Sequence, residues 1–212
     1  MSELFTRIQS LTITGQGDEL NGLVRRAMND GYAASAILEK GLIPGMNEVG
    51  RRMKSGEMFI PEVLLSAGTM QAALEILKPN LTDIEAAGAG TIVIGTVMGD
   101  LHDIGKNLVA MMLEGAGFRV IDLGVDVKPE TFVEAIKTHK PVIVGLSALL
   151  TTTMINMKKT IAAIEAAGLR GQVKIMAGGA PVTQRLVLED LGADGYGANA
   201  SEAVDRARAL LG

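Results

Sequence analysis

The sequence contains no cysteine among its 212 residues. This absence excludes disulfides, thiolate metal sites and cysteine nucleophiles, and it fits a reducing compartment. A basic block is also missing, since 20 Lys and Arg residues stand against 24 Asp and Glu residues and the net charge is −4. Without a run of positive charge to neutralise phosphates, nucleic acid is not an expected partner.

Long hydrophobic runs are absent too. The apolar runs TIVIGTVM at 91–98 and PVIVGLSALL at 141–150 fall well short of the roughly 20 residues that a membrane-spanning helix needs. The start, MSELFTRIQS, lacks the basic and then apolar layout of a secretion signal. We therefore expect a cytoplasmic protein that has no membrane partner.

Residues 1 to about 80 are predicted to be helical. Apolar residues recur at three- and four-residue spacing in the segments 20–43 and 61–77. Pro61 fits a first helical turn, and the loops are short, so neighbouring helices should pack as an antiparallel bundle. Four glycines are expected at helix ends: Gly31, Gly41, Gly45 and Gly56.

The segment 79–90, PNLTDIEAAGAG, interrupts this pattern. It is small, polar and rich in alanine and glycine, which is typical of a linker. We therefore expect two domains: a helical bundle with its linker at 1–88, and a second domain at 89–212.

The second domain alternates between strands and helices. Strand-like runs occur at 91–97, 118–124, 141–147 and 173–178, with a weaker one near 193–198. Helical stretches follow them at 105–117, 129–140, 152–168, 183–193 and 201–212. This alternation predicts βαβ units with helices on both faces of a parallel sheet. The expected fold class is α/β: an N-terminal helical bundle followed by a doubly wound, flavodoxin/Rossmann-like parallel sheet of five strands.

The loop after the first predicted strand carries the most distinctive polar residues, GDLHDIGKN at 99–107. Ligands of doubly wound sheets bind at the carboxyl ends of the strands. Asp100 lies two residues before His102, so on an extended loop both side chains point to the same side. A carboxylate that accepts the proton of one ring nitrogen leaves the other nitrogen free to bind a metal. Gly99 and Gly105 allow a sharp turn and the close approach of a bulky ligand.

Two interpretations of this histidine are open. A lone histidine beside an aspartate on a loop is usually a surface or structural residue. A zinc site held by protein alone needs three or four donors, and here Asp100 and Asp103 could add only oxygen, with no second histidine four residues on. A metal that arrives with its own equatorial ligands needs a single axial donor. In that case His102 would bind the metal of a macrocycle.

Three motifs together resemble a known family. DLHDIG at 100–105 matches the D-x-H-x-x-G motif of cobalamin-binding domains. After 41 intervening residues Ser147 and Leu149 match the family's S-x-L, and after 28 more Gly178 and Gly179 match its double glycine. The order and spacing resemble the cobalamin module of methionine synthase and the small corrinoid proteins of methanogen and acetogen methyltransferase systems.

The resemblance extends to the first domain. GEMFIPEVLLSAGTM at 56–70 is similar to the helical bundle that precedes the corrinoid module in these proteins. No substrate-binding, folate-binding or activation domain is left over, so a stand-alone corrinoid protein is expected. The bundle would act as a cap over the upper face of the corrin, with Phe59 as the candidate capping side chain. A residue at a helix start is also often simply part of the core.

The resemblance implies that His102 replaces the nucleotide base of a cobalamin (cobamide, methylcobalamin) as the lower ligand of cobalt. Asp100 would hold His102, and Ser147 would extend the hydrogen-bond chain. The displaced nucleotide tail would enter a slot lined by small residues: Gly145, Ser147, Ala148, Ala177, Gly178, Gly179 and Ala180. The implied cofactor-binding set is Gly99, Asp100, Leu101, His102, Asp103, Ile104, Gly105, Ser147, Leu149, Thr151, Gly178, Gly179, Ala200 and Phe59.

Some of these residues have simpler explanations. Glycines at strand ends often only make turns, and Thr151 could cap the following helix. The 12 methionines could be mistaken for a soft-metal site, but singly or in pairs along helices they are better read as core filler. His139 and the pair Lys158-Lys159 are expected on exposed surfaces.

The family's activity is methyl transfer. The resemblance implies a carrier that accepts a methyl group on cobalt from a substrate-specific methyltransferase and passes it to a second methyltransferase, with coenzyme M or tetrahydrofolate as acceptor. A reductive activator of cobalt would be a further partner. The cap would have to move about the 79–90 linker for the partners to reach cobalt. The sequence does not identify the methyl donor.

Three other functions compete with this one. A cobalamin-dependent sensor would need an output domain or a basic recognition helix. The small subunit of a cobalamin mutase usually lacks the bundle. A flavin or phosphate binder would need a phosphate-cradling loop after the first strand, where Asp100 and Asp103 would repel a phosphate.

Overall fold

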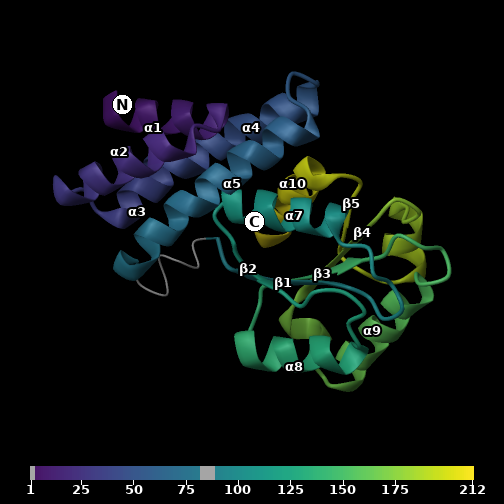
Figure 1. The fold of residues 1–212 in the computed structure, drawn as a ribbon. Helices are drawn as coiled ribbons and strands as arrows, with labels where there is room; N and C mark the ends of the chain where they lie inside the picture. The colour runs from purple at the N-terminus through teal and green to yellow at the C-terminus, as the bar shows by residue number, and fades with distance from the viewer. Residues whose placement is uncertain (1–2, 82–88) are drawn as a thin grey trace. The chain divides into compact units, whose positions relative to one another are not determined.

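The computed structural model describes residues 3–81 and 89–212, which form two compact units (Figure 1). The first unit takes the chain up to residue 89 together with 111–118, and the second takes 90–110 together with 119–212. Helix α7 (Ile104–Gly115) thus contributes to both units. For this reason the predicted boundary between residues 88 and 89 stays a prediction, and most of the predicted linker lies outside the described residues.

The first unit is built from helices, as the apolar spacing predicts. Helix α1 packs against α4, and α2 packs against α5. Their inward faces carry fully buried apolar side chains such as Ile8, Leu20, Val49 and Val63. The helices are α1 (Glu3–Thr14), α2 (Gly17–Asn29), α3 (Ala34–Ile37), the π-helical turn η1 (Leu38–Leu42), α4 (Ile43–Ser55), α5 (Ile60–Leu77) and the 3₁₀ turn η2 (Lys78–Asn80).

Two of the four glycines predicted at helix ends lie elsewhere. Gly31 and Gly56 follow the ends of α2 and α4 with φ of +89° and +76°, as expected. Gly41 and Gly45 lie inside η1 and α4, so the prediction was wrong for them. A Cβ on Gly45 would lie 2.9 Å from the Cβ of Thr12. The glycine is therefore used for the close approach of two helices, which local sequence does not reveal.

Helix α5 begins at Ile60 with Pro61 in its first turn, as predicted. The stretch Ile60–Asn80 is the one span in the described part of the chain that is long and apolar enough to cross a membrane. Val63, Met70 and Leu77 of this helix are buried. Since the core helix of a bundle has the same length and composition, this span is weak evidence for a membrane segment.

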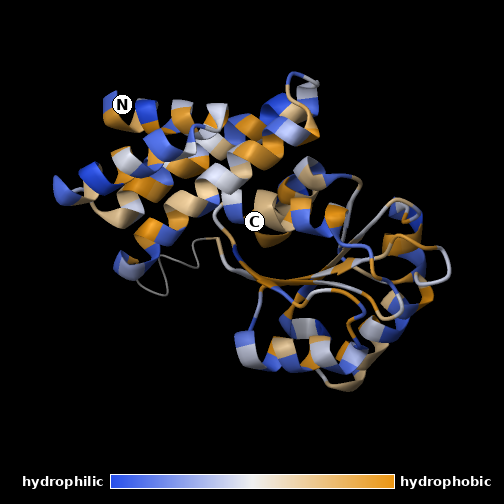
Figure 2. Ribbon diagram, in the orientation of Figure 1, coloured by the Kyte–Doolittle hydropathy of each residue, from blue (hydrophilic) through white to orange (hydrophobic). Residues whose placement is uncertain are grey.

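The second unit contains a parallel sheet in the order β2-β1-β3-β4-β5. This is the flavodoxin-like order, and it confirms the predicted fold class. The central strands β1, β3 and β4 are mainly apolar (Figure 2), as expected when helices cover both faces. They are β1 (Thr91–Thr96), β2 (Arg119–Asp122), β3 (Ile143–Ser147), β4 (Lys174–Gly178) and β5 (Gly195–Gly197).

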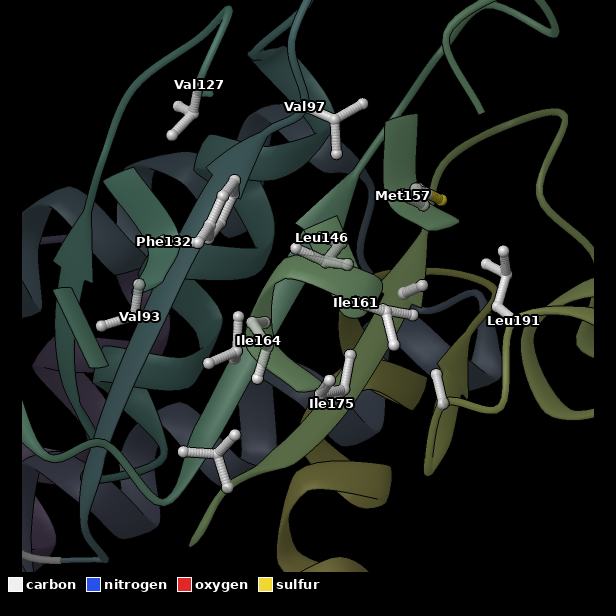
Figure 3. Packing of buried hydrophobic residues seen from close by; sticks show 14 of the residues in the cluster. Val93, Val97, Val127, Phe132, Leu146, Met157, Ile161, Ile164, Ile175 and Leu191 are labelled. Atoms are coloured by element: carbon white, nitrogen blue, oxygen red, sulfur yellow. The ribbon is translucent and has the colours of Figure 1, made fainter. Parts of the chain in front are cut away.

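Helices α8 and α9 cover one face of this sheet, and α10 with the first part of α7 covers the other (Figure 1). The main core lies on the α8/α9 face, where Val93, Leu146 and Ile175 of the strands pack against Phe132 and Ile161 (Figure 3). The remaining elements are α8 (Pro129–His139), α9 (Ile155–Ala166), η3 (Arg170–Gln172), η4 (Leu186–Asp190) and α10 (Ala200–Leu211).

The register brings four strand ends into one row. Thr96 pairs with Ser147, Ser147 with Gly178, and Gly178 with Gly197. The loops that leave these strands therefore start side by side at the carboxyl edge of the sheet. The residues from 97 to 103 and from 148 to 154 belong to two of these loops.

Candidate functional site

The loop between β1 and α7 holds the predicted aspartate and histidine. It turns at Gly99, whose φ is +83°. The side chain of Asp100 is completely buried, while that of His102 is 50% exposed. The loop thus places a carboxylate inside the protein and the neighbouring imidazole at the surface.

Asp100 and His102 form the predicted pair. One carboxylate oxygen, Oδ1, lies 2.7 Å from Nδ1 of the ring and also accepts the backbone N–H of His102 at 3.1 Å. Because an ionised carboxylate can only accept, the proton of a neutral ring lies on Nδ1. The other ring nitrogen, Nε2, meets no hydrogen-bond partner in the described part of the chain and keeps its lone pair free for a metal.

The second oxygen of Asp100 accepts three hydrogen bonds from the loop after β3. The donors are the backbone N–H of Leu149 at 2.8 Å, that of Leu150 at 3.2 Å and the hydroxyl of Thr153 at 2.6 Å. Burial raises the pKa of Asp100, but the hydrogen bonds from Thr153, His102 and Leu149 outweigh burial and hold the pKa well below its usual range. Asp100 is therefore a fixed negative charge.

The hydroxyl that extends the hydrogen-bond chain belongs to Thr153 and not to Ser147. Ser147 ends β3, where its carbonyl accepts the N–H of Val97 at 3.0 Å. Its hydroxyl makes no hydrogen bond to Asp100 or His102 in the described part of the chain, whereas Thr153, six residues further along the loop, reaches the Asp100 carboxylate. The sequence contained only a weak hint of Thr153, a run of three threonines after the strand.

Further bonds fix the loop on both sides of Asp100. The buried hydroxyl of Thr96 donates to the carbonyl of His102 at 2.9 Å. The side-chain amide of Asn156 donates to the carbonyl of Met98 at 2.7 Å. Segments from β1 and α9 therefore hold the backbone around the histidine.

Apolar side chains surround the histidine and face outward. Leu101 and Ile104 are 71% and 83% exposed, and Leu149, Leu150 and Ile155 are also exposed. Large apolar side chains gathered at one surface mark a binding site. Nothing lies within 4 Å of a Cβ built on Gly105, so a ligand can approach the first turn of α7 closely.

The donor set is too small for a metal held by protein atoms alone. In the residues 3–81 and 89–212, no group of three or more His, Cys, Asp or Glu side chains could hold a metal ion. One imidazole with a fixed tautomer, surrounded by exposed apolar residues, instead fits a metal that arrives inside a large macrocycle.

Comparison of the sequence with known protein families identifies this macrocycle. Residues 90–205 match the B12 binding domain family, and residues 4–78 match a second B12 binding domain family. The chain belongs to the corrinoid proteins with B12-binding domains. It is similar to trimethylamine corrinoid protein 1 of Methanosarcina mazei, with 46% identity over 202 residues that cover 94% of this chain and 93% of the relative.

Other relatives cover the chain to a similar extent. Dimethylamine corrinoid protein 1 of Methanosarcina acetivorans is 44% identical over 210 residues, which are 99% of this chain and 98% of the relative. Among solved structures, the methanol:cobalamin methyltransferase complex of Methanosarcina barkeri matches with a TM-score of 0.89 and 31% identity, covering 99% of this chain and 80% of that one.

The cofactor of this corrinoid protein is cobalamin, with its cobalt. The residues present fit it: Nε2 of His102 would hold the cobalt in place of the cofactor's own base, and the exposed leucines and isoleucines would contact the apolar parts of the corrin. Of the predicted loop set, the structure brings Asp100, His102 and the backbone of Leu149 together. Asp103 is turned toward Asn107, whose side chain donates to its carboxylate at 3.2 Å.

The small residues that were predicted to line the slot for the nucleotide tail lie in different environments. Gly178 and Ser147 share a sheet row, whereas Ala148 and Ala177 belong to the core on the α8/α9 face. Both alanines are fully buried there, and their contribution to the slot stays a prediction. A Cβ on Gly179, whose φ is +129°, would lie 1.9 Å from the Ala148 carbonyl oxygen, so the protein itself requires this glycine.

Three predicted site residues make no hydrogen bond to Asp100 or His102 in the described part of the chain. Ala200 is buried at the first position of α10, after the N-cap Asn199. Thr151 is exposed in the turn before α9. Phe59 precedes α5 in the helical unit and is 69% exposed. Their contacts with a corrinoid stay predictions.

Proposed function

We propose that this chain is a corrinoid methyl carrier. It accepts a methyl group on cobalt from a substrate-specific methyltransferase and passes it to a second methyltransferase, whose acceptor is coenzyme M or tetrahydrofolate. The observation that carries the proposal is the His102 imidazole, held by the buried Asp100 with Nε2 free. The similarity to methylamine corrinoid proteins over nearly the whole chain supports it.

Each residue of the site has a distinct task in this proposal. The bound corrinoid supplies the cobalt on which the methyl group is carried. Nε2 of His102 would hold the cobalt, and Asp100 keeps the proton on the opposite ring nitrogen and raises the donor strength of the ring. Thr153 and the N–H groups of Leu149 and Leu150 keep Asp100 ionised and immobile.

We infer that the methyl donor is a methylated amine. The relatives at 46% and 44% identity are named for trimethylamine and dimethylamine, whereas the methanol complex shares 31% identity. Donor specificity resides mainly in the partner methyltransferase, and a carrier must match the surface of that partner. We also propose that a protein which reduces cobalt is a further partner. The proposed location is the cytoplasm.

The helical unit is proposed to act as the cap over the methyl-bearing face of the corrin. Phe59 supports this role, because an aromatic side chain left 69% exposed at the start of a helix is available to a ligand. The backbone N–H of Phe59 donates to Glu62 at 2.9 Å, which fixes its position at the helix start. The proposed movement of the cap involves the linker, most of which lies outside the described residues.

Methylation of the bound cobalt tests the proposal. The full chain is loaded with hydroxocobalamin, reduced, and mixed in parallel with methyltransferases that act on trimethylamine, dimethylamine or methanol. We expect an amine-specific enzyme to methylate the cobalt, and a thiol or tetrahydrofolate methyltransferase to remove the methyl group again. His102→Ala should lose this cycle, and His139→Ala should retain it. Loaded protein that no methyltransferase methylates would contradict the carrier and favour a sensor.

A further inference from the structure

The loop between β2 and α8 contacts the histidine loop from the side opposite to Thr153. Its residue Asp126 accepts the backbone N–H of Gly99 through Oδ1 at 2.6 Å. The backbone N–H of Asp126 donates in return to the carbonyl of Asp100 at 2.9 Å. These two bonds hold the backbone of Gly99 and Asp100, which directly precede Leu101 and His102.

Asp126 adopts a backbone conformation that is unfavourable for its residue type. Its φ is +52°, and it is one of two residues other than glycine with positive φ in the described part of the chain. Aspartate tolerates this region better than most residues, usually because its side chain bonds to nearby backbone. Here the partner Gly99 lies 27 residues away, so a local turn does not explain the aspartate. A glycine would relieve the strain but could not accept the bond from Gly99.

Backbone hydrogen bonds anchor the rest of the β2–α8 loop to the end of β1, so the position of Asp126 is fixed. The N–H of Thr96 donates to the Gly124 carbonyl, and the N–H of Val127 donates to the Thr96 carbonyl, both at 3.0 Å. Val97 and Val127 form a parallel bridge. The loop therefore continues the sheet beside the end of β1 and presents Asp126 at its tip.

The end of β2, where this loop begins, also holds the first turn of α7, which follows the histidine loop. The Lys106 side chain, 1% exposed, forms an ion pair with Asp122 at the end of β2. The other oxygen of Asp122 accepts the N–H of Gly124 at 2.8 Å. The segment 99–106, which contains His102, is thus held at one end by Asp126 of the loop and at the other by Asp122 at the end of β2.

We propose that Asp126 is a positioning residue for the cobalt-binding histidine. It acts through the Gly99–Asp100 backbone: it fixes where the Asp100 carboxylate stands and hence the direction of the His102 imidazole. Thr153 holds the carboxylate itself, and Asp126 holds the backbone that carries it. The inference rests on the proposed axial role of His102, and it assigns a task to a residue outside the D-x-H-x-x-G motif.

Three variants separate this task from a general effect on folding. Asp126→Asn keeps an acceptor oxygen and tolerates positive φ. Asp126→Gly removes the acceptor while relieving the backbone strain, so the chain should still fold. Val125→Ala, at the exposed neighbouring position, is the matched control.

Nitrogen NMR of the imidazoles in the corrinoid-free chain is the first readout, and His139 is the internal reference, since the chain has two histidines. We expect Asp126→Gly to shift or broaden the His102 signals and leave His139 unchanged, while Asp126→Asn and Val125→Ala match the parent. The second readout is the affinity for hydroxocobalamin, which Asp126→Gly should weaken about tenfold or more, as loss of a partner behind a metal ligand does.

Unchanged His102 signals or unchanged affinity in Asp126→Gly would overturn the inference. Failure of Asp126→Asn to restore both properties would also overturn it, because the acceptor oxygen would then not be the cause. His102→Ala is measured alongside. If that variant binds the corrinoid as the parent does, the axial role of His102 fails, which is a different result from failure at Asp126.

Discussion

The hydroxyl of Thr153 donates to the buried carboxylate of Asp100 at 2.6 Å across 53 residues of sequence. This bond joins the loops that follow β1 and β3 through the same carboxylate that holds the imidazole of His102. Because both loops leave the same edge of the sheet, the fold brings together groups that no local motif contains. The orientation of His102, the proposed metal ligand, is thus set by tertiary structure.

Replacing Thr153 by valine keeps the shape and removes this bond. The Asp100 oxygen then loses its shortest donor, and we expect the free energy of unfolding to fall by about 1–3 kcal/mol. Thr153→Ser should retain most of the stability, and Thr152→Val, at the exposed neighbouring position, should be neutral. Urea unfolding monitored by circular dichroism measures all three. A Thr153→Val chain as stable as the parent would show that the bond is unimportant.

Asp100→Asn should reverse the tautomer of His102. The Asn oxygen would be drawn to the three donors from Leu149, Leu150 and Thr153, which leaves its NH₂ group facing Nδ1 of the ring. The ring proton would then move to Nε2, and that nitrogen could no longer bind a metal. Nitrogen chemical shifts of the imidazole report the tautomer. Asp103→Asn is the control, since Asp103 bonds to Asn107. A proton still on Nδ1 in Asp100→Asn would refute this reasoning.

Stability should depend on pH through Asp100. Its folded pKa lies below the unfolded value of about 3.9, so its contribution is present above that value and is lost as pH falls toward the folded pKa. The free energy of unfolding should therefore fall more steeply between about pH 5 and pH 3 in the parent than in Asp100→Asn. Thr153→Val should give an intermediate slope. Equal slopes in all three proteins would be the contrary outcome.

Gly179→Ala should destabilise the second unit strongly. Its φ of +129° disfavours any side chain, and the new Cβ would lie 1.9 Å from the Ala148 carbonyl oxygen. We expect a loss of about 2 kcal/mol or more, typical of strain at such a backbone position. Gly171→Ala is the control, because nothing lies within 4 Å of its Cβ position. Thermal unfolding distinguishes the two variants. Similar melting temperatures would mean that the loop shifts at little cost.

The features that depend on local pattern were predictable from sequence. Alternation of apolar strands with amphipathic helices fixes a parallel, doubly wound sheet, and the strand order found is the flavodoxin-like one. Asp100 and His102 are only two residues apart, so their pairing needs little beyond the loop between them. The fold class and this pair follow from short-range chemistry.

Features that depend on long-range register were not predictable. Thr153 reaches Asp100 only because β1 and β3 are adjacent, and the motif match pointed instead to Ser147. Gly45 looks like a helix end until α1 packs against it. Asp126 could have been suspected, since it follows a strand that ends beside β1, but its bond to Gly99 requires the loop conformation. In each case the missing information is a neighbour distant in sequence.

Histidine ligation of cobalt is most directly measured by electron paramagnetic resonance of the full chain loaded with cobalt(II) cobalamin. An axial nitrogen splits the cobalt lines, and labelling the protein's histidines with ¹⁵N changes the splitting only if that nitrogen comes from the protein. We predict a label-dependent splitting in the parent and in His139→Ala, and its loss in His102→Ala. A splitting that ignores the label and persists in His102→Ala would show that the vitamin's own base remains on cobalt, and would contradict the account.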